Sequence, residues 1–156
     1  MADDTAVPGA PDERSENTAL GEALAASHAA VWGYGVVGAA LGPGANAPAS
    51  TAETAHRDLR DRVTALLVDR EAEPVAARGA YALPFPVLSA IDAAALAVVL
   101  EDGVAAAWVR VLDQAAQREV RELAVGWLTA AETRAVAWRG AAGTAPATTA
   151  FPGLPE

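Results

Sequence analysis

The chain has 156 residues, of which 42 are alanine and none is lysine or cysteine, and its formal net charge is −9. The absence of cysteine excludes disulfides, thiolate zinc sites and a cysteine nucleophile. The acidic balance argues against a protein that binds the phosphate backbone of nucleic acids. Alanine is the best helix former but contributes little burial, so the composition favours helices packed at close range. We expect one all-α, cytoplasmic domain with no secretory signal and no membrane-spanning segment.

Residues 1–16 are rich in Asp, Glu, Pro and Gly and predict a disordered acidic tail. A first helix is expected from about Thr18 to Leu41, because the glycines and proline at 42–44 form a strong stop. At 100° per residue, one face of this helix is expected to point into the core. That face carries Leu20, Leu24, His28, Val31, Gly35 and Gly38.

A second, highly charged helix is expected from about Ser50 or Thr51, either of which is a plausible N-cap, to about Ala72. Residues 73–89, with two prolines, form the longest connection between helices. Fully extended, this segment reaches roughly 55 Å, whereas a helix of about 22 residues is only about 33 Å long. The connection can therefore run the full length of a bundle, and we expect its aromatic residues, Tyr81 and Phe85, to pack across the helices.

A third helix is expected from about Ala90 to Ala115, with Ser89 or Asp92 as its cap, and a fourth covers about 120–139. The polar cluster at 114–119 places the turn between them. We assign residues 17–140 to the bundle and 141–156 to a small-residue linker with a docking tail. The tail ends in an apolar pair, Phe151 and Leu154, which is expected to dock near the crossover.

Short, long and short connections are typical of a four-helix bundle with one crossover, and ferritin-like folds have that connectivity. The sequence therefore predicts an all-α, ferritin-like four-helix bundle with one long crossover between its second and third helices.

Five stretches of the sequence also carry a resemblance to a known family. They are SHAAVWGYGVVGAAL (27–41), YALPFPV (81–87), LEDGVAAAW (100–108), AVGWLTAAETRAVAWRG (124–140) and AFPGL (150–154). Together they resemble the uncharacterised ferritin-like "domain of unknown function" family of alanine-rich proteins from high-GC bacteria, over about residues 17–154. The resemblance implies the ferritin-like bundle and no particular activity. One departure is Ser27, where family members are expected often to carry a glutamate before the histidine.

A dinuclear ferritin-like centre needs a glutamate from each of two helices and Glu-x-x-His from each of the other two. Glu53 and His56 have the Glu-x-x-His spacing, but the fourth helix has no histidine, because His28 and His56 are the two histidines of the chain. Along the bundle axis, the expected positions of His28 and His56 differ by roughly 12 Å, whereas paired metal ions lie about 3.5–4 Å apart. We therefore expect no cofactor. The alternative is a partial iron or manganese site around Glu53 and His56, or around His28 and Glu101.

Two polar residues fall on or beside faces that should be buried, His28 on the first helix and Glu101 on the third. In antiparallel neighbouring helices they would lie within about 3 Å of the same level. Buried polar groups need hydrogen-bond partners. We therefore predict a structural cluster of His28 and Glu101, direct or bridged by an arginine of the second helix such as Arg60.

The function that these features favour is a non-catalytic interaction or scaffold bundle, forming a homo-oligomer or binding a protein partner. The first alternative is a metal-binding oxidoreductase or storage protein with a partial site. A second alternative is a binder of a small apolar ligand between helices, which rests on the glycines of the first helix and the four tryptophans.

Overall fold

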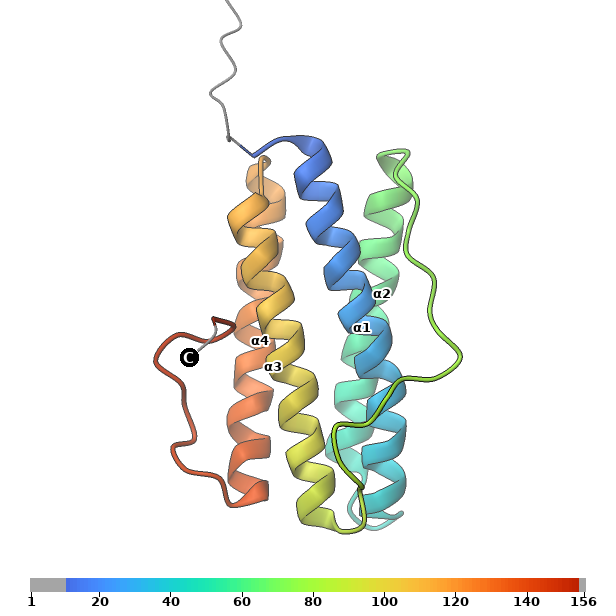
Figure 1. Ribbon diagram of the computed structural model, residues 1–156, viewed down its shortest axis with the longest axis vertical. Helices are drawn as coiled ribbons and strands as arrows, with labels where there is room; N and C mark the ends of the chain where they lie inside the picture. The colour runs from blue at the N-terminus through green and yellow to red at the C-terminus, as the bar shows by residue number, and fades with distance from the viewer. Residues whose placement is uncertain (1–10, 155–156) are drawn as a thin grey trace, which may run out of the picture.

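The computed structural model describes residues 11–154, and in this range the chain is all-helical, with four helices and no strand. The helices are α1 (Glu13–Leu41), α2 (Ala47–Asp69), α3 (Ala90–Gln114) and α4 (Arg118–Ala142). α1 and α4 run in one direction and α2 and α3 in the other, because the connection from α2 to α3 travels the length of the bundle on its outside (Figure 1). The predicted all-α fold with four helices is confirmed.

Helix α1 begins earlier than predicted. Asp12 is its N-cap, and its side chain accepts a hydrogen bond from the backbone N–H of Ser15 at 2.7 Å. Residues 13–16 are therefore helical, which corrects that part of the predicted disordered tail. Residues 1–10 of the predicted tail lie outside the described residues.

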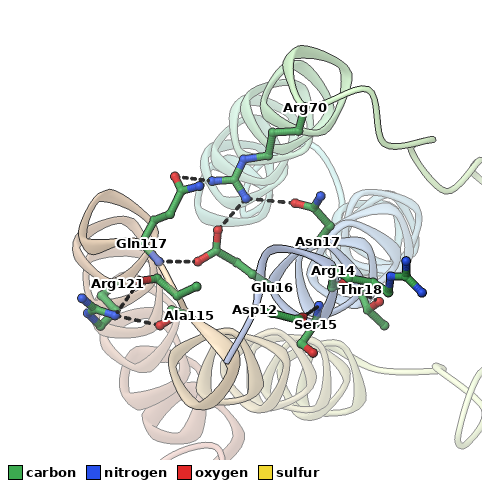
Figure 2. Close-up of polar contacts among 11 residues, drawn as sticks. Asp12, Arg14, Ser15, Glu16, Asn17, Thr18, Arg70, Ala115, Gln117 and Arg121 are labelled. Carbon is green, nitrogen blue, oxygen red and sulfur yellow. Dashed lines mark hydrogen bonds and ion pairs between the residues drawn. The ribbon is translucent and has the colours of Figure 1, made fainter. Parts of the chain in front are cut away.

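A buried ionic network explains why α1 extends this far (Figure 2). Glu16 is fully buried, and its carboxylate accepts from Arg70 Nη1 at 2.5 Å and from the backbone N–H of Gln117 at 2.8 Å. Arg70 also donates to the side chains of Asn17 and Gln117, at 2.9 Å each. The network joins the start of α1, the end of α2 and the turn between α3 and α4.

The N-cap predicted for the second helix, Ser50 or Thr51, is wrong. α2 starts at Ala47, preceded by Asn46, which makes no side-chain cap hydrogen bond, and Pro48 lies in its first turn. Proline is tolerated there because the first N–H groups of a helix have no intrahelical partner. Ser50 and Thr51 therefore lie inside the helix, where the Thr51 hydroxyl donates to the carbonyl of Ala47 at 3.0 Å.

The inward face of α1 follows a spacing of 3.5 residues per turn rather than the straight-helix spacing of 3.6. After Glu16, its larger buried members are Leu20, Leu24, Ser27, Tyr34 and Val37. A straight helix drifts by about 20° per heptad relative to this seam, so the predicted face diverges from the real one towards the C-terminus of α1. His28 is left on a half-buried flank and Gly35 is exposed.

Helix α1 is long and apolar enough to cross a membrane, judged by length and composition alone, since one 18-residue window has a mean hydropathy of 1.3. This departs from the sequence expectation. The core helix of a bundle has the same properties, and the inward residues of α1 line the core described here.

The crossover contacts the bundle through its aromatic residues. The rings of Tyr81 and Trp32 lie 5.9 Å apart at an interplanar angle of 51°, and Phe85 packs on the core while staying half-buried. The crossover therefore lies against the helices along its aromatic residues.

The C-terminal segment lies on the opposite side from the crossover, against α3 and α4 (Figure 1). It approaches α3 by its backbone. A Cβ atom added at Gly153, where φ is +77°, would lie 2.6 Å from Val109 Cγ2 and 2.8 Å from the carbonyl oxygen of Ala105. Phe151 and Leu154 remain exposed. The prediction that these two side chains dock near the crossover was therefore wrong, because a glycine makes the close contact.

Candidate functional site

A polar cluster lies in the middle of the bundle, and each helix contributes one residue to it. Glu101 of α3 is at its centre, and its Oε1 accepts three hydrogen bonds. The donors are the Tyr34 hydroxyl of α1 at 2.5 Å, His56 Nε2 of α2 at 3.0 Å and Arg134 Nε of α4 at 2.8 Å. The four residues meet because each lies about 7 to 11 residues from the same end of the bundle, which is within roughly 6 Å of one level.

The cluster is enclosed by the core. Tyr34, His56 and Glu101 are fully buried, and the side chain of Arg134 is 20% exposed. The rings of Tyr34 and His56 stack, with centroids 5.5 Å apart and planes inclined by 23°, and the Trp138 ring lies 6.2 Å from that of Tyr34. Arg134 is therefore the member of the cluster that reaches the surface.

The hydrogen bonds set the protonation of the carboxyl and of the phenol. Burial alone would raise the pKa of Glu101, but the hydrogen bonds from His56 and Arg134 outweigh it and hold this pKa below its ordinary value of 4.5. Burial and the neighbouring Glu101 carboxylate raise the pKa of Tyr34 far above its ordinary value of 10. Glu101 is thus ionised and Tyr34 keeps the proton that it donates.

Four buried polar atoms of the described chain have no hydrogen-bond partner, and they are His56 Nδ1, Glu101 Oε2, Arg134 Nη2 and Trp108 Nε1. His56 Nε2 bonds to Glu101, and Nδ1 on the other side of the ring is left without a partner. Three of these atoms, His56 Nδ1, Glu101 Oε2 and Arg134 Nη2, belong to the cluster, which therefore keeps unused hydrogen-bonding groups.

The structure gives two of the predicted cluster residues other partners. His28 Nε2 lies 3.1 Å from the carbonyl oxygen of Val75 in the crossover, and Arg60 pairs with its neighbour Asp61 at 2.8 Å. Neither makes a hydrogen bond to Glu101. The predicted partners of Glu101 are corrected, because the inward face of α1 presents Tyr34 at this level and leaves His28 on the flank.

The predicted Glu53 and His56 pair is divided between two sets of contacts. Glu53 accepts from Arg57, one turn further along α2, at 2.5 and 3.2 Å, while His56 points inward to Glu101. Within residues 11–154 no group of three or more His, Cys, Asp or Glu side chains is placed to hold a metal ion. The fourth helix contributes an arginine to the cluster, and a guanidinium beside Glu101 would repel a metal cation.

Sequence reasoning missed Tyr34 and Arg134. Tyr34 lies two heptads after Leu20, so a repeat of 3.5 residues per turn places both residues on the same buried face of α1. Arg134 lies four residues before Trp138 on the apolar side of α4, which marks it as a charged residue next to the core.

Comparisons with known proteins agree with the fold. The chain is similar to "a conserved hypothetical protein, rv2844, from Mycobacterium tuberculosis", with 38% sequence identity, a TM-score of 0.79, and coverage of 83% of this chain and 98% of that one. No curated protein matches the chain. Residues 19–156 match the sequence family described as Domain of unknown function (DUF4439). The match spans most of the sequence, so this chain belongs to the DUF4439 family.

Proposed function

We propose that this chain is a ferritin-like bundle that acts as a non-catalytic interaction or scaffold domain and associates with a second copy of itself. Its connectivity supports the ferritin-like part of the proposal. Short turns join α1 to α2 and α3 to α4, whereas residues 70–89 form a long crossover that lets α2 and α3 run parallel.

The Glu101 cluster supports the non-catalytic part. Ferritin-like metal proteins point several carboxylates and histidines of four helices into the bundle. Here one carboxylate, Glu101, accepts from three donors of the other three helices. These polar side chains form hydrogen bonds to one another, so the cluster is suited to holding the four helices together.

The observation that carries the interaction role is an open apolar face on α3. Leu88, just before the helix, is 87% exposed, Ile91 is 63% exposed and Val99 is 45% exposed. Further along the same helix the chain's own Gly153 covers Ala105 and Val109. Because the centre of a protein interface is depleted in charged residues, this stretch suits a symmetric contact in which two acidic chains keep their charges at the rim.

Sedimentation velocity over a range of protein concentrations tests this role. We expect a concentration-dependent dimer that Ile91→Arg abolishes. The matched control is Val125→Arg, because Val125 is a comparably exposed apolar residue on α4 and its replacement should leave the dimer intact. A monomer at every concentration, or equal effects of the two variants, would contradict the proposal.

A second candidate is a metal-binding ferritin-like oxidoreductase or storage protein with a partial site. What favours it is that His56 Nδ1 and Glu101 Oε2 are buried, unpartnered and able to act as ligands. Elemental analysis of protein purified without chelator separates the two candidates. We expect no stoichiometric iron or manganese. About one ion per chain would favour the partial site, and about two would require a dinuclear centre of the ferritin-like kind.

A further inference from the structure

A hollow opens on the seam between α2 and α4. These two helices pack less closely than the pairs α1–α2, α1–α3 and α3–α4. The hollow has a volume of about 370 Å³ and lies between the first turns of α2 and the last turns of α4. Small-molecule sites have volumes of roughly 300–1,000 Å³, so its size fits a small ligand.

The lining of this hollow is apolar with one cation. Pro48 and Ala52 of α2 and Trp138 and Ala141 of α4 supply apolar walls, and Arg134 is the one ionised side chain among the lining residues. Four other hollows on the described surface are each lined by at least one carboxylate. On a chain with a net charge of −9, this hollow is therefore locally suited to an anion.

Arg134 has unused donors at the hollow. A guanidinium carries five N–H groups, and Nε–H of Arg134 donates to Glu101. No other hydrogen bond holds this side chain within the described residues, and its Nη2 is buried without a partner. Nη1 is neither buried nor hydrogen-bonded within the described residues, so it can donate to an oxygen of a ligand carboxylate while Nε stays on Glu101.

We propose that the hollow between α2 and α4 binds a medium-chain fatty acid. The carboxylate of the ligand accepts from Nη1 of Arg134, and its alkyl chain lies along Ala52, Trp138 and Ala141. The apolar walls select the alkyl chain and the guanidinium selects the acid over an uncharged analogue.

Titration calorimetry with decanoate, kept below its micellar concentration, tests the proposal. We expect saturable binding of about one molecule per chain, and binding of decanol, which has the same chain without the carboxylate, should be weaker by about tenfold or more. A hydrogen bond to a charged group accounts for a difference of that size. Absence of saturable decanoate binding, or equal affinity for the two ligands, would overturn the proposal.

Two alanine-to-tryptophan variants test where decanoate binds. Ala141→Trp should fill the hollow and abolish binding without touching the contact between Arg134 and Glu101. Ala25→Trp, which alters a comparably exposed helical alanine on α1, should bind decanoate like the parent protein. In Arg134→Gln, the affinity for decanoate should fall to that for decanol. Parent-like binding by Ala141→Trp would place any bound acid elsewhere and overturn the proposal, whether or not Arg134→Gln folds.

Discussion

Replacing Glu101 with leucine should strongly destabilise the protein. The carboxylate is fully buried and is the acceptor for Tyr34, His56 and Arg134. Its removal leaves two buried donors and a partly buried guanidinium unpaired. Breaking a buried ion pair by removing one partner costs about 3–5 kcal/mol. We therefore expect the free energy of unfolding to fall by about that amount in Glu101→Leu.

The effect of Glu101→Leu should be relieved in part by a second substitution. Arg134→Met alone should cost about 1–3 kcal/mol, because Glu101 then keeps two donors but loses its charged partner. In the double variant the guanidinium is absent along with its partner. The two costs should therefore sum to more than the cost of the double variant, with a coupling free energy of about 1–3 kcal/mol.

Urea unfolding followed by far-ultraviolet circular dichroism measures these free energies. The control is a parallel cycle with Glu22→Leu and Arg110→Met, because that pair lies at 2.6 Å between two largely exposed side chains. Exposed ion pairs contribute below about 1 kcal/mol, so the control coupling should be small. If coupling at Glu101 and Arg134 is no larger than in this control, the cluster does not tie the helices together.

Two further predictions concern α1. Gly35→Ala should raise the free energy of unfolding by about 0.5–1 kcal/mol, because an added Cβ meets nothing within 4 Å. Gly33→Ala should raise the free energy of unfolding by less, because its Cβ would lie 2.7 Å from Leu100. Denaturant midpoints check this order, and a larger gain at Gly33 would contradict the packing. In a Tyr81→Phe background, Tyr34 is the remaining tyrosine and should stay protonated past its ordinary pKa of 10 until the protein unfolds. Since its pKa is raised on folding, its contribution to stability is present below pH 10 and lost as the pH rises further; tyrosinate absorbance near pH 10 in folded protein would contradict its burial.

Local signals in the sequence were sufficient to predict the end of α1 and the start of α3. The glycines and proline at 42–44 end α1 at Leu41 as predicted, and Ser89 caps α3 by accepting from the backbone N–H of Asp92 at 3.1 Å. Both signals depend on residues within one turn of the helix end, so they can be read from sequence alone.

The orientation of α1 could not be read in the same way. No Asp, Glu, Lys or Arg occurs between Glu22 and Glu53, so no polar face marks the solvent side of the C-terminal half of α1. With only a weak apolar pattern, the difference between 3.5 and 3.6 residues per turn determines which residue faces Glu101. The choice of Tyr34 over His28 is therefore made by tertiary packing.

Contacts between distant segments decide the start of α1. Glu16 binds Arg70, 54 residues away, and Gln117, 101 residues away. Composition alone assigns residues 13–16 to an acidic tail, because it does not include the burial of a single carboxylate by partners that only the fold brings close.

The middle of the bundle holds an ionised carboxylate, Glu101, that is fixed by donors from three other helices. A carbon NMR titration of the Glu101 side chain, assigned by comparison with Glu101→Gln, tests this arrangement most directly. The pKa of Glu101 is lowered on folding, so its contribution to stability is present above the ordinary value of 4.5 and is lost as the pH falls through the folded-state pKa. We expect a carboxyl that remains ionised below pH 4.5 for as long as the protein is folded. A carboxyl that takes up its proton above pH 4.5 in the folded protein would contradict this arrangement.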